Sequence, residues 1–553
     1  MDNTLDGTSV IAQHAAIPAS RTAQVGSKIS LRNSTEDEGE LTPAICWQAV
    51  YSRDRRFDGR FFVGAATTGV YCRPICPVPF AKPSNVAWFA SAAAAEGEGF
   101  RPCRRCRPEA SPGTPAWLGT SAVVSRALRL IWEGALDEGN VDALAERVGI
   151  GSRQLRRLFV QHLGAPPIKI AGTHRVHFAR NLIDETELPI TEIAFSAGFK
   201  SIREFNHAMR AACGHSPRQL RRLRGEFHAA PGQEGLLIRL PYRPPFNWSA
   251  IINFLQQRAT PGVEVVQEEY YRRTIEIAGA TGTIHVSPEK SEPCLLVRID
   301  LPKYDCLLQV VERVRRIFDL SADPVLITGH LSRDPRLKPH LEAFPGLRVP
   351  GVWDGFELGV RAILGQQLTV IDSNLVAERL VRTFGKPVKT SLKGLTHLFP
   401  RPEDLAGADL SIAGIHGTRG KVIQAFARSV CEKDLKFEAP KTLGDTVARV
   451  CAAQGVDEQV ANYVAMRAFA EPDAFPSSDA GLRRRLAAGG VPVSQAEIQR
   501  IAETWRPWRA YAVMYLWAAD AAGPSYKGGA AKSYVPGSPR NIRAVALPTH
   551  RRA

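Results

Sequence analysis

Residues 67–76 read Thr-Thr-Gly-Val-Tyr-Cys-Arg-Pro-Ile-Cys, and residues 100–106 read Phe-Arg-Pro-Cys-Arg-Arg-Cys. Each stretch carries a close pair of cysteines, and twenty-six residues separate the two pairs. The four cysteines are Cys72, Cys76, Cys103 and Cys106. Two close pairs on two loops can place four thiolates around one Zn²⁺ ion. The same spacing also fits a knuckle whose zinc is purely structural, so the spacing predicts the metal and leaves its chemistry open.

The length, composition and charge of the chain indicate the surroundings in which this cluster works. The sequence has 553 residues, of which 44% are hydrophobic, enough for three or four domains. Its net charge of +16 favours a polyanionic partner. We find no run of about 18 apolar residues and no secretory signal, so we expect no membrane contact and a cytoplasmic, nucleoid-associated location. Thiols stay reduced there, so disulfides do not explain the ten cysteines.

From about Trp47 to Pro108 the chain resembles the N-terminal domain of the Ada methyl-phosphotriester repair proteins. The resemblance implies that Cys72 takes a methyl group from a methylated DNA phosphate, irreversibly and once per protein. Four thiolates on Zn²⁺ carry a formal charge of −2, and methylation of one lowers it to −1. Weaker repulsion of DNA then offers a switch from sensor to activator. Four arginines are expected to face phosphates, or else to balance the thiolates: Arg73, Arg101, Arg104 and Arg105.

A helical region with an internal repeat follows. Residues 141–148 carry apolar side chains at i, i+3, i+4 and i+7, which predicts an amphipathic helix, and Ser152 is expected to cap the next one. The pattern returns about fifty residues later, where Gly198 marks the turn and Ser201 with Glu204 forms a capping-box pattern. Both second helices have polar outer faces typical of major-groove readers. These faces carry Arg153, Gln154 and Arg157 in the first unit, and Arg203, Asn206 and Arg210 in the second.

Residues 120–224 resemble the AraC-type regulators, through Thr-Glu-Ile-Ala at 191–194, Ala-Gly-Phe at 197–199 and Cys-Gly-His-Ser-Pro at 213–217. The resemblance implies a double helix-turn-helix that binds duplex DNA. The alternative is a plain helical bundle with solvated arginines, but the doubled pattern and the turn glycines favour DNA binding.

From Pro244 to about Ala522 the chain resembles the AlkA-type 3-methyladenine DNA glycosylases. The matching segments include Arg-Ala-Ile-Leu-Gly-Gln-Gln at 361–367, Ala-Asn-Tyr-Val-Ala-Met-Arg-Ala at 461–468 and Trp-Arg-Pro-Trp-Arg-Ala-Tyr at 505–511. They are spread over the whole region. The resemblance implies an antiparallel α+β subdomain followed by a helix-hairpin-helix core.

Within this region we expect Asp479 to be the catalytic carboxylate. It stands where a helix should begin, and a positive helix end keeps a carboxylate ionised. An ionised carboxylate can stabilise the oxocarbenium-like sugar left by the departing base. The alternative role is that of a first-turn helix residue. Phe254, Tyr463 and Trp517 match pocket positions that would hold a cationic base, with core packing as the alternative.

Three further positions bear on the reaction. Gln459 stands where lyase-type relatives carry a lysine, so we expect base removal without strand cleavage. In the hairpin at 453–459 a glycine of the family pattern is replaced by Asp457, followed by Glu458, and the apolar wedge is replaced by Gln367. A side chain at a position suited to positive φ and two carboxylates near a phosphate would weaken the grip on DNA. The glycosylase would then be slow, altered in specificity or vestigial.

Together these features predict a multidomain chain with a small α+β four-cysteine zinc domain, an all-α double helix-turn-helix domain, an α+β subdomain with an antiparallel sheet and an all-α helix-hairpin-helix core. The predicted division is a disordered tail at 1–42, the zinc domain at 43–115, the helix-turn-helix domain at 116–225, the α+β subdomain at 236–343, the glycosylase domain at 344–522 and a basic tail at 523–553.

The function we expect is a bifunctional DNA alkylation repair enzyme and regulator that binds one zinc ion. Its partners are damaged and promoter double-stranded DNA and RNA polymerase, and the chain is expected to be a monomer. The second hypothesis is a transcription activator with a methyl-acceptor zinc site and a non-excising glycosylase fold. A third makes the charge a surface trait and the zinc purely structural.

Overall fold

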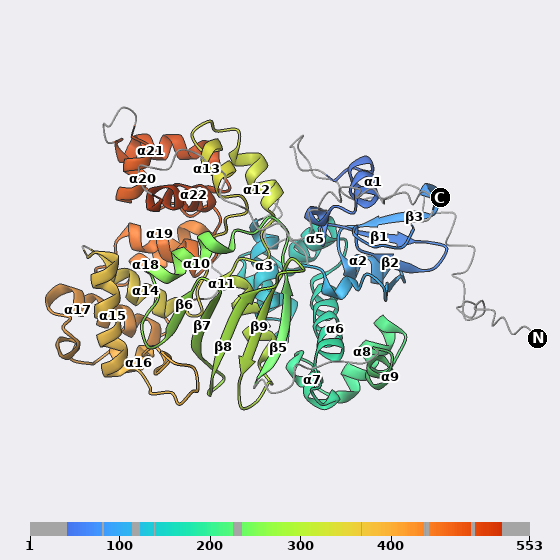
Figure 1. Ribbon diagram of the computed structural model, residues 1–553, viewed down its shortest axis with the longest axis horizontal. Helices are drawn as coiled ribbons and strands as arrows, with labels where there is room; N and C mark the ends of the chain where they lie inside the picture. The colour runs from blue at the N-terminus through green and yellow to red at the C-terminus, as the bar shows by residue number, and fades with distance from the viewer. Residues whose placement is uncertain are drawn as a thin grey trace, which may run out of the picture.

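The computed structural model describes residues 41–79, 82–112, 122–137, 139–224, 235–366, 368–435, 437, 442–487 and 493–522. Almost all of both predicted tails, and Gln367, therefore lie outside the described residues. Figure 1 shows the segments up to about residue 224 on one side of the molecule, and the large sheet with the later helices on the other. The chain is multidomain, with mixed helix and sheet.

The first unit is built on a four-stranded sheet in the order β3-β1-β2-β4. Strand β1 pairs antiparallel with β2 and β3, whereas β2 and β4 are parallel. Phe61 and Val63 are buried against Cys46 of the first helix, because alternate residues of a strand share one face. Its elements are α1 (Pro43–Ser52), β1 (Phe62–Ala65), β2 (Val70–Cys72), β3 (Val86–Phe89), α2 (Ala92–Gly97) and β4 (Arg101–Pro102).

Seven helices follow and form the predicted double helix-turn-helix. They are α3 (Ala122–Trp132), α4 (Val141–Arg147), α5 (Ser152–Leu163), α6 (Pro167–Glu185), α7 (Ile190–Ser196), α8 (Ile202–Cys213) and α9 (Pro217–Arg222). Helices α5 and α8 are the second helices of the two units, and the long helix α6 joins the units. Leu155 and Phe159 of α5, like Phe205 and Met209 of α8, are buried.

One predicted cap is wrong by one residue. Helix α5 begins at Ser152 itself, and its N-cap is Gly151, which has an extended conformation and offers no side chain to the first turn. In the second unit one of the two hydrogen bonds of the predicted capping box is present, since the Ser201 hydroxyl accepts from the Glu204 N–H at 3.1 Å. The Glu204 carboxylate accepts instead from the N–H of Lys200, so the reciprocal bond of a capping box is replaced.

The third unit contains the predicted antiparallel sheet, in the order β5-β9-β8-β7-β6. Helix α11 covers it with an apolar face that buries Val310 and Val314 against Ile284 and Val297 of the sheet. Its elements are β5 (Leu236–Pro241), α10 (Trp248–Gln257), β6 (Glu264–Gln267), β7 (Tyr270–Ile277), β8 (Ala280–Pro288), β9 (Cys294–Asp300), α11 (Leu307–Ile317), α12 (Pro324–Leu331) and α13 (Lys338–Ala343).

The last unit is helical and surrounds a second core, in which Val360, Phe426 and Val464 from α14, α17 and α19 are buried together. Its helices are α14 (Gly355–Gly365), α15 (Val370–Phe384), α16 (Pro402–Leu405), α17 (Gly417–Cys431), α18 (Leu443–Cys451), α19 (Glu458–Arg467), α20 (Ala480–Arg485), α21 (Gln495–Ala502) and α22 (Arg509–Ala521). Within the described ranges, no helix has both the length and the apolar composition needed to cross a bilayer.

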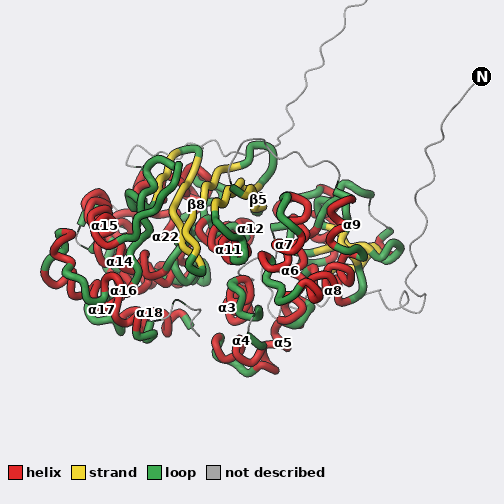
Figure 2. The backbone as a smooth tube through the Cα atoms, turned by 90° about the horizontal axis from the view of Figure 1, so that it is seen from below, coloured by secondary structure: helices red, strands yellow, loops and turns green. Residues whose placement is uncertain are grey.

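The half of the molecule that contains the described residues between 41 and 224 is in direct contact with the half that contains those between 235 and 522. Figure 2 shows α3 next to α11, between the two halves. Arg316 of α11 pairs with Glu133, just after α3, at 2.7 Å, and Arg126 of α3 pairs with Glu471, just after α19, at 2.9 Å. The first unit also takes part, since Arg60 pairs with the buried Asp323 at 3.0 Å. The two halves therefore meet through polar contacts as well as apolar packing.

Candidate functional site

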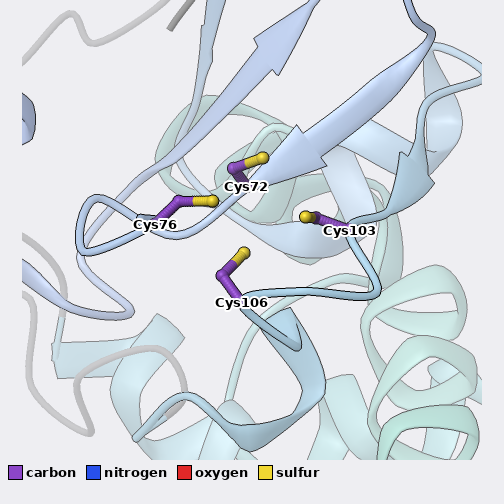
Figure 3. A group of neighbouring side chains, drawn as sticks. All are labelled: Cys72, Cys76, Cys103 and Cys106. Atoms are coloured by element: carbon purple, nitrogen blue, oxygen red, sulfur yellow. The ribbon is translucent and has the colours of Figure 1, made fainter. Parts of the chain in front are cut away.

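The four cysteines of the first unit converge on one point. The parallel pairing of β2 with β4 sets Tyr71 beside Pro102, and each strand leads directly into one cysteine pair. The four sulfur atoms lie within 4.8 Å of one another, and Figure 3 shows them pointing towards a common centre. Cys76 and Cys106 are buried, whereas Cys72 and Cys103 are partly exposed. Solvent can therefore reach the cluster on the side of Cys72 and Cys103.

The donor set fits a zinc ion. All ten cysteines are free thiols, and four converging thiolates are the ligand set of tetrahedral zinc. Hydrogen bonds within the group lower the pKa of the Cys103 thiol, with Cys106 as the largest cause, and raise the pKa of the Cys72 thiol, with Cys103 as the largest cause. The backbone N–H of Arg73 donates to the Cys106 sulfur at 3.4 Å, a contact that also favours a thiolate at that position.

The four arginines near the cluster differ in their surroundings. Arg73 is partly exposed; its guanidinium pairs with Asp58 and donates to the Cys106 carbonyl at 3.2 Å, so it holds the cysteine loops together. Arg105 is exposed and Arg101 is partly exposed. Arg104 is exposed and hydrogen-bonds to the ring of His215, between α8 and α9.

A polar cluster that the sequence did not reveal joins the zinc site to the helix-turn-helix region. The hydroxyl of Tyr71, the residue before Cys72, donates to Glu96 at 2.9 Å and lies 3.1 Å from His177 of α6. Thr173 of α6 donates to the same carboxylate at 2.6 Å. Burial opposes ionisation of Glu96, but its hydrogen bonds and the charge of His177 outweigh burial and lower its pKa. The strand that carries Cys72 is thus tied directly to α6.

The predicted DNA-reading side chains lie on the outer faces of α5 and α8. Arg153, Gln154 and Arg157 are exposed on α5, and Arg203 and Arg210 are exposed on α8. Asn206 is half-buried, and its amide donates to the Ile202 carbonyl at 2.9 Å.

In the helical unit, Asp479 is the N-cap of α20, as the sequence predicts. Its Oδ1 accepts from the backbone N–H of Leu482 at 3.0 Å and from the indole N–H of Trp517 at 2.9 Å. The carboxylate is partly exposed rather than buried. Two fixed donors therefore hold Oδ1 of a partly exposed carboxyl group at the start of a helix.

The predicted aromatic residues come together beside Asp479. Trp517 stacks on Phe254 with 6.3 Å between ring centres and lies 6.1 Å from Tyr463. Two arginines that the sequence did not single out lie in the same group. Arg258 lies over the Phe254 ring at 4.0 Å, and Arg467 lies 5.0 Å from the same ring and donates to the Tyr463 hydroxyl at 2.7 Å. Each stands four residues after its aromatic partner, a helical spacing that could have revealed both.

The hairpin between α18 and α19 corrects another expectation. The residue with positive φ is Gly455, at +87°, whereas Asp457 has φ −85° and is the N-cap of α19. Its carboxylate accepts from the Val460 N–H at 2.8 Å and from the Gln366 amide at 2.9 Å. Asp457 is therefore unstrained and stabilises the helix. The predicted backbone conflict is wrong because the turn takes its left-handed residue two positions earlier.

Gln459, at the position of the lyase lysine, is exposed near the start of α19. Its side-chain oxygen accepts from the hydroxyl of Ser478 at 3.2 Å. An amide therefore lies beside the residue that precedes Asp479, and an amide cannot form a Schiff base.

Comparisons with known families give three matches along the chain. The family described as the metal binding domain of Ada matches residues 45–109. A helix-turn-helix domain family matches residues 144–223, and the AlkA N-terminal domain family matches residues 237–354. The four cysteines fall inside the first match, and the β5–β9 sheet, apart from Leu236, falls inside the third.

Among curated proteins, the chain is 41% identical over 477 residues to the probable bifunctional transcriptional activator/DNA repair enzyme AlkA of Mycobacterium tuberculosis, covering 85% of this chain and 95% of that protein. It is 30% identical to DNA-3-methyladenine glycosylase 2 of Escherichia coli, over 51% of this chain and 96% of the relative. It is 32% identical to the E. coli bifunctional transcriptional activator/DNA repair enzyme Ada, over 33% of this chain and 49% of the relative. Among solved structures, a 3-methyladenine DNA glycosylase from Archaeoglobus fulgidus aligns with 52% of this chain and 99% of its own, at 22% identity and a TM-score of 0.46.

Proposed function

Because the chain belongs to the family of bifunctional transcriptional activator/DNA repair enzymes, with an Ada-type four-cysteine zinc site, a helix-turn-helix region and an AlkA-type glycosylase region, we propose that it repairs alkylated DNA by two reactions. One is methyl transfer from DNA methylphosphotriesters to Cys72. The other is hydrolytic excision of alkylated purines such as 3-methyladenine. The observation that carries the proposal is the presence of both sites in one chain, the convergent sulfurs in one half and Asp479 with its aromatic neighbours in the other.

We assign the methyl acceptor to Cys72, which is partly exposed at the end of β2. Zinc bound to the four cysteines would hold them as thiolates, the nucleophilic form. The Cys72 sulfur bonds to the methyl carbon as the bond from that carbon to the phosphate oxygen breaks, which leaves a thioether and a phosphodiester anion. The partly exposed Arg101 and the exposed Arg105 are available to phosphates, whereas Arg104 hydrogen-bonds to His215 and Arg73 is engaged with Asp58.

Methylation of Cys72 removes one negative charge from a cluster that faces DNA, and tighter DNA binding follows. We propose that this change switches the protein to a transcription activator that reads duplex DNA with α5 and α8. Arg153, Gln154 and Arg157 would contact DNA from α5, as would Arg203, Asn206 and Arg210 from α8. RNA polymerase is then a partner, and the protein acts as a cytoplasmic, nucleoid-associated monomer.

In the other half we assign base removal to Asp479. Its ionised carboxylate stabilises the positive sugar as the bond between sugar and base breaks, and water adds to the sugar. Arg258 and Arg467 lie at the aromatic end of the site and add to the stabilisation of the positive sugar. During the reaction positive charge moves from the base to the sugar. It therefore moves away from these two guanidinium groups and towards the Asp479 carboxylate. Gln459 offers no amine, so strand cleavage is not expected.

The alternative, a glycosylase fold that no longer excises bases, rested on the departures in the hairpin. The cap role of Asp457 removes one of its three reasons, the backbone conflict, because the turn has its positive φ at a glycine. The carboxylates of Asp457 and Glu458 near a phosphate and the replacement of the apolar wedge by Gln367, which lies outside the described residues, still support it. The exposed Glu458 remains near the region expected to approach DNA.

The test is incubation of the pure protein with methylated duplex DNA. We expect release of methylated purines, at least about a hundredfold slower in Asp479→Asn. Mass spectrometry should show one added methyl group on Cys72. No base release above a protein-free control, with Cys72 still methylated, would favour the activator with a non-excising fold. An unchanged mass of Cys72 would contradict the first reaction.

A further inference from the structure

Helix α3 belongs to the regulatory half, the described residues between 41 and 224. It contacts the segment that carries Asp479 in the glycosylase half, the described residues between 235 and 522. It lines a cavity of about 120 Å³ together with α11 and the residues that follow α19. Arg126 and Arg129 face this cavity from α3, and Arg467, which contacts the base pocket, borders it from the other side. A helix of the DNA-reading region and a residue of the excision site thus line one cavity.

The strongest contact across this space is between Arg126 and Glu471. The guanidinium donates twice, from Nε to Oε1 and from Nη2 to Oε2, both at 2.9 Å. Arg126 is 8% exposed and Glu471 is 2% exposed. A bidentate pair in such a buried place has well-defined geometry, and loss of one partner would leave a buried charge without its bidentate partner, although Arg129 also lies near Glu471.

Glu471 starts the short segment that leads from α19 to Asp479. Its N–H donates to the Ala465 carbonyl at 3.1 Å, and its own carbonyl accepts from Ala474 at 3.2 Å. Ala470, immediately before it, has a φ of +48°, which a residue other than glycine rarely adopts. Farther along, Arg509 of α22 holds the Asp473 carboxylate at 2.7 Å. The segment is therefore clamped from two sides, and one of the two clamps belongs to the regulatory half.

We propose that Arg126 is a positioning residue for base removal, which fixes the segment from Glu471 to Asp479 from within the helix-turn-helix region. The inference rests on the proposed role of Asp479. Helix α3 also packs against α5, a helix that we assign to DNA reading. The contact therefore makes the rate of excision depend on the placement of the regulatory half.

The test uses the full-length, zinc-loaded protein and four variants. Arg126→Met keeps an unbranched side chain and removes the charge, Glu471→Gln removes the partner charge, and the double variant removes both. Arg126→Lys restores a cation without the forked geometry. The matched control is Arg316→Met, which breaks the ion pair with Glu133 between the same two halves. Arg316 lines the same cavity, but it pairs with Glu133 and not with the segment of Asp479.

Base release is measured at saturating enzyme in a single turnover, together with DNA affinity. We expect the rate to fall on the order of tenfold in Arg126→Met and in Glu471→Gln, with DNA affinity within twofold of wild type. The double variant should be no slower than the slower single variant, because both changes remove one interaction. Arg126→Lys should recover part of the rate, and Arg316→Met should stay within twofold of wild type.

Hydrogen exchange of the backbone amides from 471 to 485 provides a readout that does not require activity. We expect faster exchange there in Arg126→Met and wild-type exchange in Arg316→Met, with methyl uptake at Cys72 unchanged in both. Equal rates and equal exchange in Arg126→Met and wild type would overturn the proposal, as would an equal loss in Arg316→Met. Wild-type protein that releases no base would contradict the role of Asp479, while the exchange data would still decide whether Arg126 fixes the segment.

Discussion

At the level of single residues, the chemistry of the glycosylase half depends on how Asp479 is held. One of its oxygens accepts from both a backbone N–H and the indole of Trp517. A carboxylate fixed by two donors needs little reorganisation when positive charge develops beside it. Trp517 therefore has two roles, as an aromatic wall of the pocket and as a donor to the carboxylate.

These two roles can be separated. Trp517→Phe keeps an aromatic ring and removes the donor, so we expect single-turnover base release about tenfold slower with DNA affinity nearly unchanged. Phe254→Leu removes a ring that does not touch Asp479, and it should weaken binding of the damaged base more than it slows the reaction. The assignment of Trp517 would be contradicted if its variant lost affinity and kept the wild-type rate.

Asp319 provides a prediction on stability. Burial raises its pKa to about 6, although Arg348 and the hydrogen bonds from Tyr511 and Val349 oppose the shift. Between about pH 4 and 6 the folded chain holds a proton that the unfolded chain releases, so stability falls as the pH rises through this window. Asp319→Asn removes this dependence, and asparagine tolerates the positive φ of 47°.

We expect Asp319→Asn to raise the melting temperature by about 2 °C or more at pH 7 and to leave it nearly unchanged at pH 4. The comparison is a pair of thermal scans at each pH, with Glu268→Gln as a control at an exposed carboxylate. A gain that is the same at both pH values would contradict ionisation as its cause.

The residues of the candidate sites were predictable where the signal was local. The cysteine spacing and the helix start at Asp479 both lie within short stretches, and the structure has Asp479 as an N-cap. Arg258 and Arg467 have a weaker local signal, a cation four residues after an aromatic residue, which apolar periodicity does not detect. The cluster of Tyr71, Glu96 and His177 had no local signal, since its members come from different elements.

At the level of elements, the hairpin before α19 shows how one residue serves both fold and function. Asp457 caps the helix, yet its charge lies on the side expected to approach a DNA phosphate. Asp457→Asn keeps a side-chain oxygen for the Val460 N–H and removes the charge. We expect stability within about 0.5 kcal/mol of wild type and DNA binding several-fold tighter at low salt, with the gain lost at high salt.

Asp457→Ala removes the charge and the cap together. We expect it to lose about 1 kcal/mol of unfolding free energy in denaturant titrations, in contrast to the asparagine variant. If both variants bind DNA like wild type at every salt concentration, the hairpin does not approach a phosphate.

The elements that the sequence predicted followed from periodicity and end signals. The amphipathic helix predicted at 141–148 contains α4, and the turn expected at Gly198 lies between α7 and α8. The errors occurred where a position was identified by analogy with a family pattern, as at Asp457, or where two neighbouring residues could both serve as N-cap, as at Gly151 and Ser152. A cap is decided by the backbone conformation of one residue, which sequence spacing does not fix.

At the level of the whole molecule, the arrangement of the units could not be predicted. Arg126 and Glu471 are 345 residues apart, and Arg60 and Asp323 belong to units with separate family matches. Neither pair is marked by composition or spacing. Such contacts depend on which surfaces meet after each unit has folded, so they appear only in the structure.

The two repair sites nevertheless belong to different units, and this separation gives the last prediction. Cys72→Ala removes the acceptor sulfur, so methyl uptake from phosphotriesters should be abolished. Base release should stay within twofold of wild type, because no contact of Cys72 reaches the segment from Glu471 to Asp479. Asp479→Asn should slow base release and leave methyl uptake unchanged. Cys431→Ala, at a cysteine outside the cluster, should change neither methyl uptake nor base release. Zinc content and thermal scans report whether the alanine variant keeps its metal and fold. Loss of base release in a folded, zinc-loaded Cys72→Ala protein would mean that the acceptor site controls excision directly, and not only through the placement of α3.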